Sequence, residues 1–391
     1  MPFSQLRRRA PGLIPVALLA LFAGLAQELL GVCGPFTDTP SDAFCAFILE
    51  VFYLGITTGT TPTTYDPTGN VNRTQMAAFL YRSVDGVLKR GSRRAVLDQF
   101  WTTQNGAVLR LTTVGLNPQV VRSDGADLWV ANFTSASVSR VHGSDGRLLE
   151  TWTSALSATG VLVAAGYIFV TGRTNPGQLY QIDPSQPAGA VTTVASNLGN
   201  GPTGIAFDGS RIWTANGNGG SVSIVTPGAA LPWTVTTITT GFTQPWGALY
   251  DGANLWVTDI TAGTLLKLDN AGAILQTVTV GASPRNPIFD GTSLWVPSNT
   301  SNSVMVIRAS SGTVLATLTG NGLNAPFTAA FDGQRILVPN LSGDSVSLWK
   351  AADLTPLGFF GTGAGTGPFG ACGDGVSFWV TLTGAGTLAR F

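Results

Sequence analysis

Short apolar segments separated by glycine-rich turns follow one another from about residue 105 to the end of the chain. In residues 201–225, GPTGIAFDGSRIWTANGNGGSVSIV, the segments Thr203–Phe207 and Arg211–Ala215 flank an Asp-Gly pair, and Ser221–Val225 follows an Asn/Gly loop. Short runs of this composition between turn residues predict β-strands. With a fourth strand expected over Trp233–Ile238, the stretch predicts one four-stranded unit.

This unit recurs seven times. Asp-Gly pairs follow one another at intervals of 39 to 43 residues, with Ala165-Gly166 in the place of the second pair. In every other unit a proline precedes the aspartate by six residues, and a large apolar residue follows it by five. The aspartates are Asp124, Asp208, Asp251, Asp290, Asp332 and Asp374, and the large residues are Trp129, Trp213, Trp256, Trp295, Leu337 and Trp379, with Phe169 in the second unit. The repeat predicts an all-β fold, a seven-bladed β-propeller with each tryptophan packed between successive sheets.

The two ends of the repeat region are expected to complete one blade together. The seventh unit ends at Phe391 after its third strand, Thr387–Phe391, and has no fourth. Residues 105–115 align without a gap with 271–281, the fourth strand of another unit. Supplying the missing strand from the N-terminal side removes two exposed sheet edges. We therefore expect strand-exchange closure of a propeller that spans 105–391.

The beginning of the chain has the pattern of an export signal. Arg7–Arg9 precede the apolar run Leu13–Leu25, which ends in small residues. This run is short for a membrane-spanning helix, which needs roughly 20 residues. We expect a signal peptide over 1–26, cleaved near Ala26, with an uncleaved anchor as the alternative. A third alternative, lipidation, rests on the loose lipoprotein-box match at Leu30–Cys33.

Residues 34–82 predict a small α-helical module, and 83–104 a basic linker. Asn72 can cap the second helix with Gln75 three residues on, and Ser41-Asp42 can cap the first. Two helices bury little surface alone, so the module is expected to need a second copy, a neighbouring domain or an oligomer.

Within this module, Phe36-Thr37-Asp38, Tyr65-Asp66-Pro67 and the ten residues VNRTQMAAFL at 71–80 resemble an S-layer homology (SLH) domain. That family attaches exported bacterial proteins to the cell envelope, usually as three copies, through a Thr-Arg-Ala-Glu type motif that contacts a wall polysaccharide. The chain has one copy, and its motif, Asn72-Arg73-Thr74-Gln75, keeps the arginine but lacks the acid. The resemblance implies that Arg73 binds an anionic wall glycan. The alternative is a solvated arginine at a helix start.

The repeats resemble the YVTN and NHL propellers and the streptogramin lyase group, as in residues 241–248, GFTQPWGA, followed by Asp251-Gly252 and Leu255–Asp259. The resemblance implies the fold rather than an activity, because propellers host many activities. The lyases use a histidine as general base. The single histidine, His142, aligns with turn residues after a third strand, so we expect it on the surface of the opposite face.

Composition narrows the function further. Only 11% of residues are charged, with 21 basic and 21 acidic side chains, which argues against binding of nucleic acid or an anionic membrane. Export permits a disulfide between Cys33 and Cys45, whereas Cys372 is expected as a small buried residue on a repeat strand. None of the three cysteines has metal-ligand spacing, and we expect no metal and no cofactor.

The loops opposite the Asp-Gly turns are the candidate ligand-binding surface. They carry aromatic, amide and guanidinium groups, which suit sugars or extended peptides. The candidate residues are Phe133, Arg173, Asn216, Trp246, Asp259, Arg285, Asn299, Phe327, Asn340 and Phe369. In the alternative, the Asn and Asp residues serve the turns, and the apolar residues that follow the prolines plug the channel.

These observations predict an exported protein of the cell surface. Its propeller is expected to be a non-catalytic platform for a glycan or peptide, with cell-wall polysaccharide or an extracellular protein as partner. One alternative is an extracellular lyase or hydrolase; a hydrolase would have to use carboxylates such as Asp259 and Asp344. Another is a structural surface-layer subunit.

Overall fold

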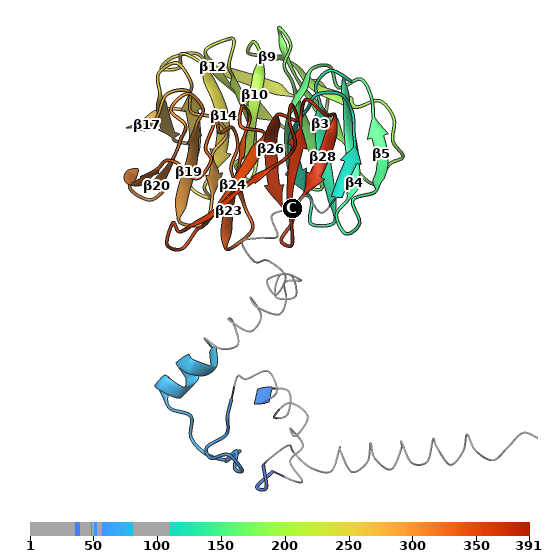
Figure 1. Ribbon diagram of the computed structural model, residues 1–391. Helices are drawn as coiled ribbons and strands as arrows, with labels where there is room; N and C mark the ends of the chain where they lie inside the picture. The colour runs from blue at the N-terminus through green and yellow to red at the C-terminus, as the bar shows by residue number, and fades with distance from the viewer. Residues whose placement is uncertain (1–35, 40–47, 49–50, 53–56, 81–109) are drawn as a thin grey trace, which may run out of the picture. The chain divides into compact units, whose positions relative to one another are not determined.

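The computed structural model describes residues 36–39, 48, 51–52, 57–80 and 110–391 (Figure 1). The chain divides into two compact units, 1–95 and 96–391. The expected signal peptide, the basic linker, Cys33 and Cys45 lie outside the described residues. In the described part of the chain, no helix is long and apolar enough to cross a membrane.

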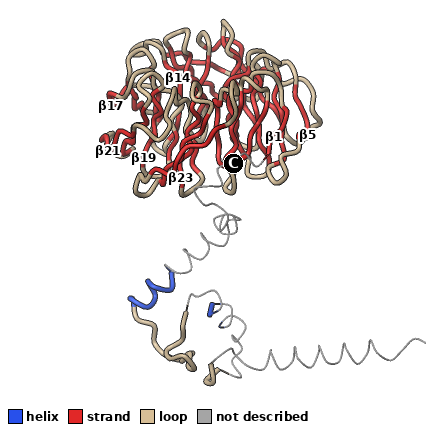
Figure 2. The backbone as a smooth tube through the Cα atoms, in the orientation of Figure 1, coloured by secondary structure: helices blue, strands red, loops and turns tan. Residues whose placement is uncertain are grey.

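The larger unit is a seven-bladed propeller of four-stranded antiparallel sheets. Figure 2 shows its strands in red, joined by loops in tan. In the first six blades, consecutive strands pair in chain order. Blade 1 holds β2 (Pro118–Ser123), β3 (Asp127–Asn132), β4 (Ser137–His142) and β5 (Leu148–Trp152). Blade 2 holds β6 (Ala158–Ala164), β7 (Tyr167–Gly172), β8 (Gly177–Ile182) and β9 (Thr192–Leu198). Blade 3 holds β10 (Pro202–Phe207), β11 (Ile212–Asn216), β12 (Ser221–Thr226) and β13 (Thr234–Ile238).

The later blades repeat this order. Blade 4 holds β14 (Pro245–Tyr250), β15 (Leu255–Asp259), β16 (Thr264–Leu268) and β17 (Ile274–Thr279). Blade 5 holds β18 (Ile288–Phe289), β19 (Ser293–Ser298), β20 (Ser303–Arg308) and β21 (Thr313–Leu318). Blade 6 holds β22 (Ala330–Phe331), β23 (Arg335–Asn340), β24 (Ser345–Lys350) and β25 (Pro356–Gly361). Blade 7 holds β26 (Pro368–Gly373), β27 (Phe378–Leu382), β28 (Thr387–Arg390) and β1 (Arg110–Thr113).

The expected closure is confirmed in blade 7. Its outermost strand is β1, which pairs antiparallel with β28 from Arg110 opposite Arg390 to Thr113 opposite Thr387. The first described strand of the unit therefore completes the blade formed by the last three. The two ends of the repeat region therefore lie in one sheet, and blade 7 has four strands like the other blades.

The Asp-Gly turns explain the spacing of five between aspartate and tryptophan. In blade 1, one oxygen of Asp124 accepts the backbone N–H groups of Ala126 and Asp127, and the other accepts the indole N–H of Trp129 at 2.8 Å. The same carboxylate–indole bond measures 2.6–2.7 Å in blades 3, 4, 5 and 7. The turn glycines have φ of 87° to 98°, a region that favours glycine. Blade 2 replaces this turn with Ala165-Gly166, where both residues have positive φ, as in a tight hairpin turn.

Each large apolar residue packs against the next blade, so the core lies between sheets. Trp129 of blade 1 contacts a cluster that includes Ile168 and Tyr180 of blade 2. Trp379 of blade 7 belongs to a cluster with Leu128 and Val130 of blade 1, which continues the core around the ring.

Glycines two residues after the proline let neighbouring inner strands approach backbone to backbone. A Cβ on Gly204 of blade 3 would lie 2.5 Å from the carbonyl oxygen of Trp246 in blade 4. A Cβ on Gly370 of blade 7 would overlap the carbonyl oxygen of Gln119 in blade 1. That oxygen also accepts a hydrogen bond from Thr381 Oγ1 of blade 7 at 2.6 Å. The close approach therefore requires glycine in the Pro-x-Gly sequences of blades 3 and 7.

In the smaller unit, several residues that resemble the SLH pattern contact one another. Phe36 is buried and packs against Phe52 and Tyr65, with ring centroids 5.2 and 5.5 Å away. The Asp38 carboxylate accepts the backbone N–H groups of Tyr65 and Asp66, which lowers the Asp38 pKa. These contacts order the loop before the second helix.

The predicted capping box of that helix, which covers 73–80, is confirmed. Asn72 Oδ1 accepts the N–H of Gln75, and Gln75 Oε1 accepts the N–H of Asn72, both at 2.9 Å. Positions 48, 51 and 52 of the predicted first helix are helical. The predicted cap of the first helix at Ser41-Asp42 lies outside the described residues.

Candidate functional site

The residue after each strand-initiating proline lies where the inner strand is irregular. In blades 4 and 7, the register shifts between Pro245 and Ala248 and between Pro368 and Ala371. In blades 5 and 6, the inner strands shrink to two residues, and the prolines before them make only isolated bridges. Such breaks redirect a side chain out of the sheet pattern.

Five of the residues predicted from the sequence lie close together at the end of the propeller opposite the Asp-Gly turns. The Phe327 ring centroid lies 6.0 Å from that of Trp246 and 3.8 Å from that of Phe369. The Arg285 guanidinium lies 4.7 Å from the Trp246 centroid and 4.9 Å from the Phe327 centroid, and the Arg173 guanidinium lies 5.0 Å from the Trp246 centroid. Because they come from blades 2, 4, 5, 6 and 7, they converge on the propeller axis. We call these five residues the mouth cluster.

Two of the three aromatic rings in the mouth cluster are too buried to form the expected surface on which a ligand stacks. Trp246 is 9% exposed and Phe327 is 4% exposed. Both arginines stack on Trp246, and Arg285 also covers Phe327. The rings of Trp246 and Phe327 are therefore packed inside the propeller, which favours the alternative in which they plug the channel, whereas Phe369 is half-buried. A ligand would therefore meet the half-buried Arg173, Arg285 and Phe369 rather than the rings of Trp246 and Phe327.

The two arginines carry positive charge without a carboxylate partner. In the described chain, no carboxylate lies within ion-pairing distance of Arg173 or Arg285. Arg173 donates one long hydrogen bond, 3.4 Å, to Asn218 Oδ1, and the buried Nε of Arg285 has no partner among the described residues. Burial and the neighbouring Arg173 charge lower the pKa of Arg285 to about 10. Burial also lowers the pKa of Arg173. This arrangement favours binding of an oxyanion.

Three other predicted residues use their side chains within their own loops. Asn216 Nδ2 donates to Ser221 and Ser223, and Asn340 Nδ2 donates to Ser345 and Ser347. The Asp259 carboxylate accepts the backbone N–H groups of Thr243, Gln244 and Ala262. All three residues are buried. The pattern Asn-x4-Ser-x-Ser, found also from Asn132, is the signal for this structural role.

The remaining predicted residues lie outside the mouth cluster. Phe133 follows β3 and is half-buried, with its backbone N–H bonded to Asn117. Asn299 follows β19 and donates through Nδ2 to the carbonyl of Pro326 at 3.4 Å, joining blades 5 and 6. Arg73, in the smaller unit, is exposed at the first helical position.

The residues that an enzymatic reaction would need do not lie together in a catalytic arrangement. His142 ends β4 opposite Asp127, at the Asp-Gly end of blade 1, and bonds to the exposed Asp145 at 3.1 Å. The Asp344 carboxylate accepts the N–H groups of Gly367 and Gly365, which lowers its pKa. Cys372 is a free, buried thiol on β26, as expected, and burial raises its pKa to about 12. Among the described residues, no His, Cys, Asp and Glu side chains gather as a metal site.

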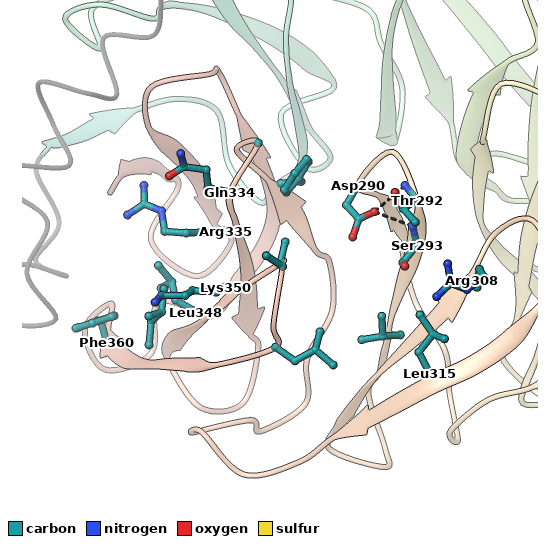
Figure 3. A pocket seen from close by; sticks show the side chains of 17 residues that line it. Asp290, Thr292, Ser293, Arg308, Leu315, Gln334, Arg335, Leu348, Lys350 and Phe360 are labelled. Carbon is teal, nitrogen blue, oxygen red and sulfur yellow. Dashed lines mark hydrogen bonds between the residues drawn. The ribbon is translucent and has the colours of Figure 1, made fainter. Parts of the chain in front are cut away.

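Sequence reasoning missed a cavity of about 860 Å³ at the Asp-Gly end of blades 5 and 6 (Figure 3). In blades 1, 4 and 7 the residue opposite the tryptophan is Arg140, Lys267 or Arg390, whose charge lies 5.2–5.4 Å from the ring centroid. In blade 5 that residue is Val306. Within the described ranges no cation covers Trp295, and the space stays open.

Comparisons with known proteins support the fold. No family model matches the chain. No curated protein matches it in sequence. Among solved structures, it is similar to streptogramin B lyase, with 16% identity, a TM-score of 0.60, and coverage of 72% of this chain and 96% of that one.

Two further structures show the same likeness. Hydrazine synthase of Kuenenia stuttgartiensis has 17% identity and a TM-score of 0.60, over 74% of this chain and 98% of that one. The WD40 propeller domain of Doa1 has 12% identity and a TM-score of 0.59, over 73% and 95%. At these identities the likeness extends to the propeller fold and to no activity.

Proposed function

We propose that this protein is exported, is associated with the cell envelope, and binds an oxyanion-bearing glycan at the mouth cluster without catalysing a reaction on it. The observation that carries the proposal is the pair Arg173 and Arg285, which share the Trp246 ring and have no carboxylate partner in the described chain. An anion bridging the two groups gains charge-assisted hydrogen bonds and relieves their repulsion.

Amide groups beside the mouth cluster favour a sugar as the carrier of this anion. Asn218 contacts Arg173, and Asn299 contacts the residue before Phe327. Such amides pair with hydroxyl groups, which every sugar unit supplies. An acidic peptide has fewer groups that match them. It is therefore the rival outcome of the binding test.

Attachment to the envelope rests on the N-terminal sequence. The apolar run after Arg7–Arg9 supports export, and the SLH-like residues support contact with a wall polymer. Arg73 is exposed and free to meet an anionic polymer. We expect the protein in the envelope fraction of the cell, and Arg73→Gln to move part of it to the soluble fraction.

The catalytic alternatives find less support. A lyase that depends on histidine has no histidine near the mouth cluster, because His142 lies at the opposite end of blade 1. A carboxylate acting as general acid needs a raised pKa, whereas that of Asp344 is lowered. The surface-layer alternative predicts sheets or filaments of purified protein, which electron microscopy can detect.

Binding of trigalacturonate, measured by calorimetry, tests the proposal. Because each lost charged hydrogen bond weakens binding by roughly 1.5–3 kcal/mol, we expect Arg173→Gln with Arg285→Gln to weaken binding by at least about tenfold. Arg308→Gln, which removes an arginine at the far end of blade 5, is the matched control and should bind normally.

Three outcomes contradict parts of the proposal. Unchanged binding by the double variant removes the mouth cluster as the site. Equal binding of the methyl ester of trigalacturonate shows that the carboxylates are not recognised. Tighter binding of a glutamate-rich peptide replaces the glycan by a peptide ligand.

A further inference from the structure

We propose that the cavity at the Asp-Gly end of blades 5 and 6 is a second binding site, for a small amphipathic anion of the fatty acid type. The cavity opens at the Asp-Gly end of the blades, away from the mouth cluster, so the proposal is independent of the one above. Its volume of about 860 Å³ lies within the roughly 300–1,000 Å³ typical of small-molecule sites.

The walls of the cavity are mainly apolar. They combine side chains from the outer three strands of blade 5 with side chains from blade 6 and its last hairpin. Val306, Phe331 and Leu354 belong to the apolar cluster between blades 5 and 6, whereas Leu348, Leu357 and Phe360 belong to the cluster between blades 6 and 7. Leu315 of β21 adds an exposed apolar side chain. An apolar chain would replace water along these walls and gain about 0.8 kcal/mol for each buried methylene group.

The charges of the cavity select an anion. Arg308 of blade 5 and Lys350 of blade 6 both line the cavity and are exposed (Figure 3). Arg308 lies two residues after Val306 on β20, whereas Lys350 pairs with Arg335, which lies over Phe378 of blade 7. In the described parts of the chain neither Arg308 nor Lys350 has a carboxylate within ion-pairing distance. The lining acid, Asp290, already accepts hydrogen bonds from Thr292, Ser293 and the indole of Trp295. The available charge is therefore positive, and it suits a carboxylate head group.

The comparison among blades indicates how the cavity arises. Where blades 1, 4 and 7 place a long cationic side chain against the tryptophan, blade 5 places Val306. Blade 3 also has an aliphatic residue there, Ile224, but Arg211 covers Trp213 from another position. Blade 5 has no such replacement among the described residues, and Arg308 stays exposed at the rim. A single substitution can restore the filled arrangement.

Calorimetry with dodecanoate below its micellar concentration, on the full chain, tests this site. We expect Val306→Arg to fill the cavity as in blade 1 and to weaken binding by at least tenfold, whereas Val306→Ile should bind normally. Leu315→Glu is a second variant at an exposed position, and it should weaken binding by charge repulsion without affecting folding.

The head group is tested separately with dodecanol, the neutral analogue. We expect dodecanoate to bind more tightly than dodecanol to the wild type, and Arg308→Gln to reduce that preference about fivefold or more. Equal binding of both ligands to the wild type overturns the charge argument. Unchanged dodecanoate binding by both Val306→Arg and Leu315→Glu overturns the site itself. If Val306→Arg does not fold, Leu315→Glu alone decides.

Discussion

The two ends of each blade differ in how much their residues vary from one blade to the next. At the Asp-Gly end, five blades repeat the same bond between an aspartate and the indole of a buried tryptophan. At the other end, the residue after the proline changes from blade to blade: Gln119, Trp246, Arg285 and Phe327 occupy equivalent positions. Repetition marks what the fold requires in every blade, and variation marks where the molecule can differ from other propellers.

The same comparison applies within the Asp-Gly end. Blades 1, 4 and 7 cover their tryptophan with a cation, whereas blade 5 leaves an open cavity at Val306. A departure from the repeat is therefore informative at either end. Substitutions at repeated positions should change stability, and substitutions at varied positions should change binding.

Removing the closing strand should have the largest effect on stability. Deleting Ala107–Val114 removes β1 and exposes the edge of β28. We expect the melting temperature to fall by roughly 10 °C or more, because the loss of several kcal/mol shifts the transition of a domain this size by that amount. A melting curve equal to that of the wild type, measured by circular dichroism, would contradict closure through this strand.

Removing a repeated tryptophan should have the next largest effect. Trp256 is fully buried and bonded to Asp251. We expect Trp256→Ala to lower the free energy of unfolding by about 3–5 kcal/mol in denaturant titrations. Phe359→Ala, at a residue that is 58% exposed, is the control and should change it by less than about 0.5 kcal/mol. Equal losses in the two variants would break the distinction between framework and surface.

A bulkier residue in the channel wall should destabilise less than the lost tryptophan. A Cβ at Gly370 overlaps the backbone of blade 1, so we expect Gly370→Val to lower the free energy of unfolding by about 1–3 kcal/mol. Gly361 has no heavy atom within 4 Å of a Cβ, and Gly361→Ala should have little effect. The same denaturant titration compares them, and a neutral Gly370→Val would show that the inner strands can separate.

The smallest effect concerns pH and the mouth cluster. The pKa of Arg285 is lowered to about 10, so its guanidinium is charged below that pH and neutral above it. Binding of trigalacturonate should therefore be constant from pH 7 to about 9 and should weaken as pH rises through about 10. An affinity that stays constant up to pH 11 would exclude Arg285 as the titrating contact.

The fold was predictable because its determinants are local and repeated. The spacing from proline through Asp-Gly to tryptophan places two strands and a turn, and seven copies define the propeller. The strand predicted over Arg211–Ala215 is Ile212–Asn216, a shift of one residue. Closure was also predictable, because residues 105–115 align with a fourth strand elsewhere in the chain.

The candidate site was predictable only in part. Trp246, Arg285, Phe327 and Phe369 each follow a proline of the repeat, so the sequence predicts them at one end of the propeller. Their burial depends on contacts between blades, which no local sequence pattern encodes. Asn216 and Asn340 were chosen for their loops, although the serines five and seven residues later already use their amide groups. The cavity beside Val306 is likewise a property of two blades together.

Thermal unfolding with and without trigalacturonate tests the central claim most directly, because it measures stability and binding at once. Without ligand, the Arg173→Gln, Arg285→Gln variant should melt within about 2 °C of the wild type, since it removes no framework residue. With ligand, only the wild type should gain in melting temperature. A variant that melts far below the wild type without ligand, or that gains as much with it, would contradict the assignment of the mouth cluster to binding.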